Sequence, residues 1–186
     1  MEKTDEQILD AFIKEATREQ AFGWLLQKYQ QRLYWQIRRM VIVHDDADDV
    51  IQNVMMKVWR HLGGFKRNSS LHTWLYRISV NESLAFLEKK KKHLTVSLEQ
   101  PNSEEEDNGP GLQIAADPWF NGEDLERKLQ QAILKLPDKQ RLVFNLRYYD
   151  EMPYEEMSEI LGTSVGALKA SYHHAAKKIE QMITED

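Results

Sequence analysis

The residues with the clearest chemical potential lie in one short stretch, GGFKRNSSLHTWLYRISVNESL, which runs from Gly63 to Leu84. It combines positive charges, aromatic rings and small hydrogen-bonding side chains. Single-stranded nucleic acid is bound by such a combination, because a cationic groove follows the phosphates while rings or pockets receive unstacked bases. A polar turn followed by a core helix that buries Trp74 and Leu75 fits the same composition equally well. The charges are Lys66, Arg67 and Arg77, the rings are Phe65, His72, Trp74 and Tyr76, and the hydrogen-bonding groups are Asn68, Ser69, Ser70 and Asn81.

A second pattern, near the C-terminus, predicts two helices joined by a tight turn. The first helix covers residues 154–161 and ends at Gly162, and Thr163 or Ser164 caps the second. This is the helix-turn-helix pattern, in which the second helix enters a DNA major groove with its N-terminal half. A plain helical hairpin fits the same spacing. The outward, DNA-facing side is expected to carry Ser164, Gly166, Lys169, Ala170, Ser171, His173, His174 and Lys177, whereas Val165, Leu168, Tyr172, Ala175, Ile179 and Met182 are expected inside.

Acidic residues gather in HDDADD, residues 44–49, where a metal site and an ordinary helix start are the alternatives. Asp is favoured in the first turn of a helix without any metal, so the helix start is preferred. The adjacent His173 and His174 point in different directions on a helix, which disfavours a two-histidine site. The chain shows no phosphate-cradling glycine loop, nucleophile elbow or paired carboxylates with a partner base. We therefore expect no enzyme, no catalytic residue, no cofactor and no metal.

Helices must position all of these side chains. Apolar residues recur at three- and four-residue steps over residues 5–92, and strand alternation is missing. Breaks are expected at His44–Asp46 and over residues 63–70. The stretch 99–123 is rich in proline, glycine and acid, and is typical of a flexible linker. The predicted fold is all-α, with helical domains at residues 1–92 and 124–186 joined by an acidic linker at residues 93–123.

Prolines mark the ends of the C-terminal helices. Helices are expected to resume at Glu123, and Pro137 ends the first of them, with Asp138 as the N-cap of the next. Pro153 suits the first turn of a further helix.

The net charge of −5 hides an uneven distribution. Residues 1–92 carry 16 Lys and Arg against 12 Asp and Glu, whereas residues 93–124 carry eight acids and no Lys or Arg. A phosphate backbone responds to a local basic face, so the overall acidity does not exclude nucleic acid. The chain has no cysteine, no apolar run of membrane-spanning length and a polar N-terminus unlike a secretory signal. We expect a cytoplasmic protein without direct membrane insertion.

Two longer stretches resemble the extracytoplasmic-function (ECF) subfamily of RNA polymerase sigma factors, within the sigma-70 family. Residues 44–87, from HDDADDVIQNVMMKVWRHL to TWLYRISVNESLAFL, resemble region 2, and residues 129–179, from LQQAILKLPDKQR to SVGALKASYHHAAKKI, resemble region 4. The spacing leaves no room for a separate region 3 domain, which is typical of the compact subfamily.

The resemblance implies a transcription initiation factor that binds RNA polymerase core, directs it to −35/−10 promoters and promotes melting of the −10 region. The helix of residues 46–59 would dock on the β′ clamp helices, and the β flap is a further expected contact. The helix from Ser164 would read the −35 element with the outward residues named above. The expected core-binding residues are Asp46, Asp49, Gln52, Asn53 and Met56, and the expected −10 residues are Phe65, Lys66, Arg67, Asn68, Ser69, Ser70, His72, Arg77 and Asn81.

Other implied features concern partners and regulation. An anti-sigma factor is an expected partner, and the acidic linker would thread toward the polymerase active-site cleft. After Lys169 this chain has Ala170, Ser171, Tyr172 and two histidines where family members commonly carry arginines, so its sequence-independent DNA affinity should be low. A stand-alone helix-turn-helix regulator is the alternative function; it leaves the pattern at residues 46–81 unexplained, and neither a dimer surface nor an effector pocket is evident.

Overall fold

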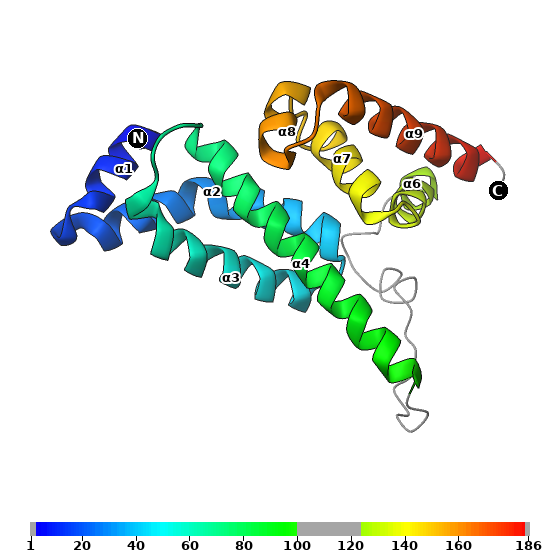
Figure 1. The fold of residues 1–186 in the computed structure, drawn as a ribbon, viewed down its shortest axis with the longest axis horizontal. Coiled ribbons are helices and arrows are strands. Elements are labelled where there is room, and N and C mark those ends of the chain that lie inside the picture. The colour runs from blue at the N-terminus through cyan, green and yellow to red at the C-terminus, as the bar shows by residue number, and fades with distance from the viewer. Residues whose placement is uncertain (1–2, 100–123, 185–186) are drawn as a thin grey trace. The chain divides into compact units, whose positions relative to one another are not determined.

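The computed structural model describes residues 3–99 and 124–184, and all regular secondary structure in these ranges is helical, which confirms the all-α prediction (Figure 1). The chain divides after Phe86 into two compact units. Residues 100–123, which make up most of the predicted linker, lie outside the described ranges. None of the described helices is long and apolar enough to cross a membrane.

The first unit is built from α1 (Asp5–Ile13), α2 (Arg18–Val41), α3 (His44–His61) and the start of α4 (Leu71–Glu99), with 3-10 turns at Glu15–Thr17 and Leu62–Gly64. Its helices form because their apolar residues recur on one side. Several of these side chains are fully buried: Ile8, Leu25, Leu33, Ile37, Val54 and Leu75. A capping box between Thr4 and Gln7 fixes the start of α1.

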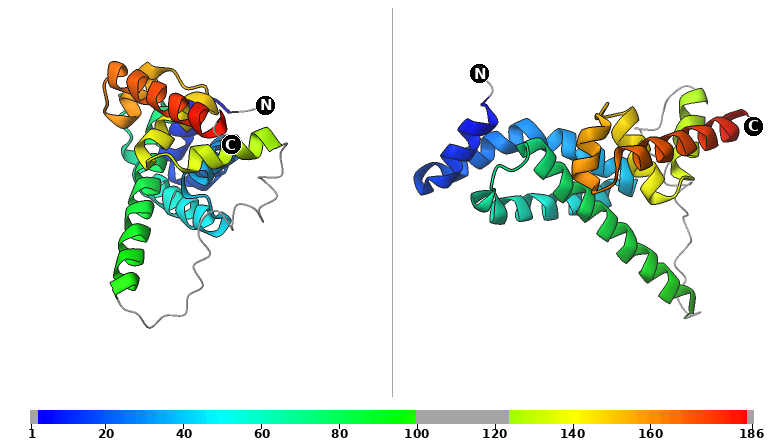
Figure 2. Two further views of the ribbon diagram at one scale, coloured as in Figure 1. Left: turned by 90° about the vertical axis from the view of Figure 1, so that its right-hand side faces the viewer. Right: turned by 45° about the horizontal axis from the view of Figure 1, so that its top comes forward.

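Helix α4 crosses α2 and α3 (Figure 1), as two further views also show (Figure 2). Two polar interactions fix this crossing. The buried hydroxyl of Ser79 donates a hydrogen bond to the Gln36 side chain of α2, and Lys57 of α3 pairs with Glu82. The buried Ser79–Gln36 hydrogen bond fixes the position of α4 along α2, because a shift of either helix would leave both polar groups without this partner.

The break between α2 and α3 falls at Ile42 and Val43, two residues before the predicted break at His44–Asp46. Ile42 has φ 75°, and its N–H bonds to the Arg38 carbonyl and closes α2. Asp45 and Asp46 then lie in the first turn of α3, where the helix dipole favours acids. The acids therefore belong to the new helix and not to the break.

The second unit contains α6 (Asp124–Leu134), α7 (Asp138–Tyr148), α8 (Tyr154–Leu161) and α9 (Val165–Thr184). Pro137 and Pro153 both occupy N-cap positions, so the expectations of Asp138 as an N-cap and Pro153 within the first turn are wrong by one residue. Proline can precede the first turn because its φ is already close to helical and its missing N–H costs nothing there. A shared core of α6, α7 and α9 holds the unit together: Ala132, Ile133, Leu136, Phe144, Ala175 and Ile179.

The predicted turn between α8 and α9 is confirmed. Gly162 ends α8 in the left-handed conformation, with φ 62°, which glycine adopts without steric cost. Of the two candidate caps, Ser164 is the one used, since its Oγ accepts a hydrogen bond from Ala167 N at 3.3 Å.

Candidate nucleic-acid interface

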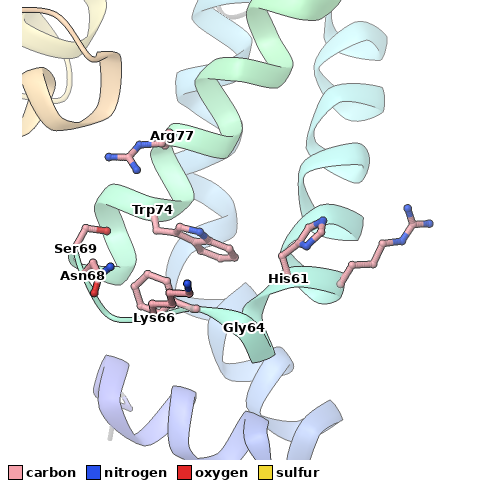
Figure 3. A pocket seen from close by; sticks show the side chains of 9 residues that line it. His61, Gly64, Lys66, Asn68, Ser69, Trp74 and Arg77 are labelled. Atoms are coloured by element: carbon pink, nitrogen blue, oxygen red, sulfur yellow. The ribbon is translucent and has the colours of Figure 1, made fainter.

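A pocket of about 520 Å³ lies where the end of α3, the α3–α4 loop and the first two turns of α4 meet (Figure 3). Its lining carries four side chains able to be cationic and no carboxylate, together with two rings and two small polar groups. The lining residues are Arg60, His61, Gly64, Phe65, Lys66, Asn68, Ser69, Trp74 and Arg77. A cavity of this chemistry suits an unstacked base whose flanking phosphates need positive charge.

Trp74 is the central ring of this pocket. It projects from α4 toward the end of α3, where His61 lies, and its ring contacts that of Phe65 with centroids 5.2 Å apart (Figure 3). Trp74 is half-buried, whereas its neighbour Leu75 is fully buried in the core. The alternative prediction placed both residues in the core, and it is correct for Leu75 alone, because Trp74 lines the pocket.

Five of the predicted −10 residues line the pocket together with Trp74: Phe65, Lys66, Asn68, Ser69 and Arg77. Arg60 and His61, which also line it, were not anticipated. They occupy the last turn of α3, directly before the two glycines, and their nearness in sequence to the loop was the available signal.

Other predicted −10 residues lie outside the lining. His72 packs on the buried Tyr76, with ring centroids 4.3 Å apart, and faces Tyr29 at 6.3 Å. Ser70 caps α4, since its Oγ accepts a hydrogen bond from Thr73 N at 2.9 Å. Asn81 is exposed on α4, one helical turn beyond Arg77.

Arg67 has a distinctive place at the rim of the pocket. It adopts φ 56°, a strained conformation for a residue with a side chain, and its guanidinium pairs with the carboxylate of Asp10 in α1. Both side chains are about half exposed or more, so the pair contributes little to stability. The Asp10 carboxylate does, however, neutralise one cation next to a cationic pocket.

We expect Asp10→Asn to strengthen binding of a single-stranded −10 oligonucleotide about two- to five-fold at low salt, because it frees Arg67 from an exposed pair worth about 0.2–1 kcal/mol. Fluorescence anisotropy of the labelled strand measures this. Glu19→Gln, an equal charge change on an exposed part of α2, serves as the control. Weaker binding by Asp10→Asn alone would mean that the ion pair instead holds the loop in its binding conformation.

The predicted polymerase-binding residues lie along one side of α3. Asp49, Gln52, Asn53 and Met56 are exposed, and Asp46 is half-buried near Arg38. Burial lowers the pKa of the Arg38 guanidinium, and this effect outweighs the nearby Tyr34, Asp46 and Asp48, which favour its charged form. Trp59 continues this helix and is 38% exposed, and its ring meets Phe12 and Phe22 edge-on.

The outward side of α9 agrees with its sequence prediction. Gly166, Lys169, Ala170, His173, His174 and Lys177 are exposed and Ser171 is half-buried, while Leu168, Ala175 and Ile179 are buried. Val165, Tyr172 and Met182, expected inside, are only partly covered. Burial raises the pKa of the Tyr172 hydroxyl.

Comparisons with known proteins show the family to which the chain belongs. Residues 25–93 match the family model described as Sigma-70 region 2, and residues 126–179 match the model described as Sigma-70, region 4. The chain is also 30% identical over 174 residues to the ECF RNA polymerase sigma factor SigW of Bacillus subtilis, covering 89% of this chain and 90% of that protein. The chain belongs to the ECF group of the sigma-70 family.

Other relatives of this sigma factor extend the match over most of its length. The ECF RNA polymerase sigma-E factor of Escherichia coli is 28% identical over 184 residues, which covers 96% of each chain. Two solved structures share the fold, each with a TM-score of 0.69. One is CnrH in complex with the cytosolic domain of CnrY, at 20% identity and 98% coverage of both chains. The other is the sigma factor RpoE of Bartonella quintana in complex with the anti-sigma factor NepR, at 23% identity, covering 89% of this chain and 98% of that one.

Both candidate sites lie within segments that match the family models. This sigma factor acts in transcription initiation. The pocket lies wholly within the region 2 match, and the outward side of α9 lies within the region 4 match. Asp10, which pairs with Arg67, precedes the region 2 match.

Proposed function

We propose that this sigma factor directs RNA polymerase core to −35/−10 promoters and helps to melt the −10 region by capturing an unstacked base of one strand. The observation that carries this proposal is the pocket around Trp74, with its rings, its cations and its lack of a carboxylate. Capturing an unstacked base in a pocket offsets the few kcal/mol that leaving the stack costs.

The −35 element would be bound as duplex by α9. Its exposed outward side begins with Gly166 and Lys169, where small residues allow close approach and a cation reaches phosphates or guanine edges. His173 and His174 are both exposed within two turns of Lys169, and they are proposed as further contacts.

The exposed side of α3 would bind the β′ clamp helices of the polymerase, and region 4 would contact the β flap. Support comes from the carboxylate and amides of Asp49, Gln52 and Asn53 beside the exposed, adaptable side chain of Met56. The cytoplasm is the proposed location. An anti-sigma factor is a proposed partner, and the structural neighbour RpoE is in complex with the anti-sigma factor NepR.

Asp49→Lys tests the polymerase surface. Reversal of a charge at the centre of the proposed interface should weaken binding to RNA polymerase core at least about ten-fold, since like charges placed together across an interface cost several kcal/mol. Co-elution on size exclusion and titration of labelled protein measure this. Glu19→Lys, a similar reversal on exposed α2, is the matched control.

The same titration tests the whole proposal. If the folded wild-type protein fails to bind RNA polymerase core at low and moderate salt, the sigma mechanism is excluded for this chain. A stand-alone helix-turn-helix regulator is then the surviving function.

A further inference from the structure

Tyr154, the first residue of α8, carries an arrangement that the proposed DNA contacts leave unexplained. Two cations lie over its ring: the guanidinium of Arg147 in α7 at 5.2 Å from the ring centroid, and the ammonium of Lys169 in α9 at 5.7 Å. The ring of Tyr172, also in α9, meets it edge-on at 6.5 Å and 75°. One half-buried ring therefore connects three helices of region 4.

Arg147 gives this ring a fixed support. Its guanidinium donates hydrogen bonds to the carbonyls of Glu151 and Met152, at 3.4 and 3.2 Å, in the loop that leads into α8. Glu151 has φ 50°, a strained conformation that the surrounding contacts must maintain. The start of α8, and with it Tyr154, is thereby held relative to α7.

Lys169, unlike Arg147, is exposed. Within residues 3–99 and 124–184, Lys169 forms no ion pair. A lysine on a helix surface normally samples many rotamers, and ordering them on DNA binding costs affinity. A ring within 6 Å attracts the ammonium and restricts those rotamers before DNA arrives. Lys169 is also the charged side chain closest to the N-terminal end of α9, the half expected to enter the groove.

We infer that Tyr154 is a positioning residue for −35 recognition, which holds the Lys169 ammonium in the orientation that binds the promoter. This rests on the proposed role of α9. Tyr154 acts through Lys169 and need not touch DNA itself. The aromatic ring and not the hydroxyl supplies the attraction, so phenylalanine at this position retains most of it.

A double-mutant cycle on the holoenzyme, made from RNA polymerase core and the full chain, tests this inference. Affinity for a promoter fragment is compared with affinity for the same fragment with a scrambled −35 element, for wild type, Tyr154→Leu, Lys169→Ala and the double variant. We expect Tyr154→Leu to lower the −35-dependent affinity about two- to five-fold, Tyr154→Phe to restore it, and Tyr154→Leu to add no further loss when Lys169 is alanine.

Tyr148→Leu is the matched control, because Tyr148 is an exposed tyrosine of the same unit that stacks on Phe144 and not on Lys169. An equal loss from Tyr154→Leu with and without Lys169 overturns the inference and leaves the proposed function standing. No loss from Lys169→Ala overturns the proposed −35 contact, and the inference with it.

A second measurement does not depend on Tyr154→Leu. The side-chain methylene protons next to the Lys169 ammonium should show an upfield ring-current shift in the NMR spectrum of the wild-type protein. This shift should persist in Tyr154→Phe. Its absence in the folded wild-type protein overturns the inference, even if Tyr154→Leu fails to fold.

Discussion

The double substitution Lys66→Ala and Arg77→Ala should lower open-complex formation at least about ten-fold, while binding to RNA polymerase core changes less than about two-fold. Both residues line the Trp74 pocket, and removing a side chain that binds a nucleic acid strand costs about 1–3 kcal/mol. The residues proposed to bind RNA polymerase core lie elsewhere, on the exposed side of α3. Fluorescence of 2-aminopurine placed in the −10 element measures melting, and titration of labelled protein measures core binding.

The comparison variant is Arg67→Ala with Asn81→Ala, which removes one cation and one polar side chain from the predicted −10 set. Neither residue lines the pocket, and Arg67 already pairs with Asp10. The decrease in open-complex formation should therefore be smaller than for the pocket variant, with core binding again retained. A larger decrease from this second variant, or an equal decrease of melting and core binding from the first, would show that the pocket does not hold the melted strand.

Lys169→Glu should lower −35-dependent promoter affinity by about ten-fold or more without weakening core binding. Lys169 is exposed near the N-terminal end of α9, so the substitution removes a cation from the groove and places a carboxylate against the phosphates. The salt dependence should also decrease, because one fewer cation displaces counterions from DNA. Promoter binding by the holoenzyme across a salt series measures both effects.

Lys178→Glu provides the control for this prediction. It lies on the same helix, and it is exposed like Lys169, but its ammonium bonds to Gln140 of α7 at 3.0 Å, away from the start of α9. An equal decrease in affinity from both variants would mean that net charge alone governs promoter binding. Failure of Lys169→Glu to fold would contradict the exposed position of Lys169.

Local patterns along the chain predicted most of the elements that carry these residues. Helix α8, the turn at Gly162 and the exposed side of α9 follow from spacing within about 30 residues, because helical periodicity alone decides which side chains share a side. Errors in the position of these elements were confined to helix ends. The break at Ile42 and the caps at Pro137 and Pro153 depend on single backbone groups, which periodicity does not specify.

The composition of the Trp74 pocket also followed from the sequence, since most of its lining comes from one loop and the helix that follows it. Sequence could not determine which of two neighbouring hydrophobic residues, Trp74 or Leu75, faces the pocket. Only the packing of α4 on α2 and α3 buries Leu75 and leaves Trp74 in the lining.

Interactions between segments distant in the chain were decided by tertiary structure alone. Asp10 meets Arg67 across 57 positions, and Tyr154 meets both Arg147 and Lys169 from two different helices. The local pattern around each of these residues does not indicate its partner. Their pairing depends on how whole helices pack, which is set by the summed burial of many apolar side chains and not by the identity of either partner.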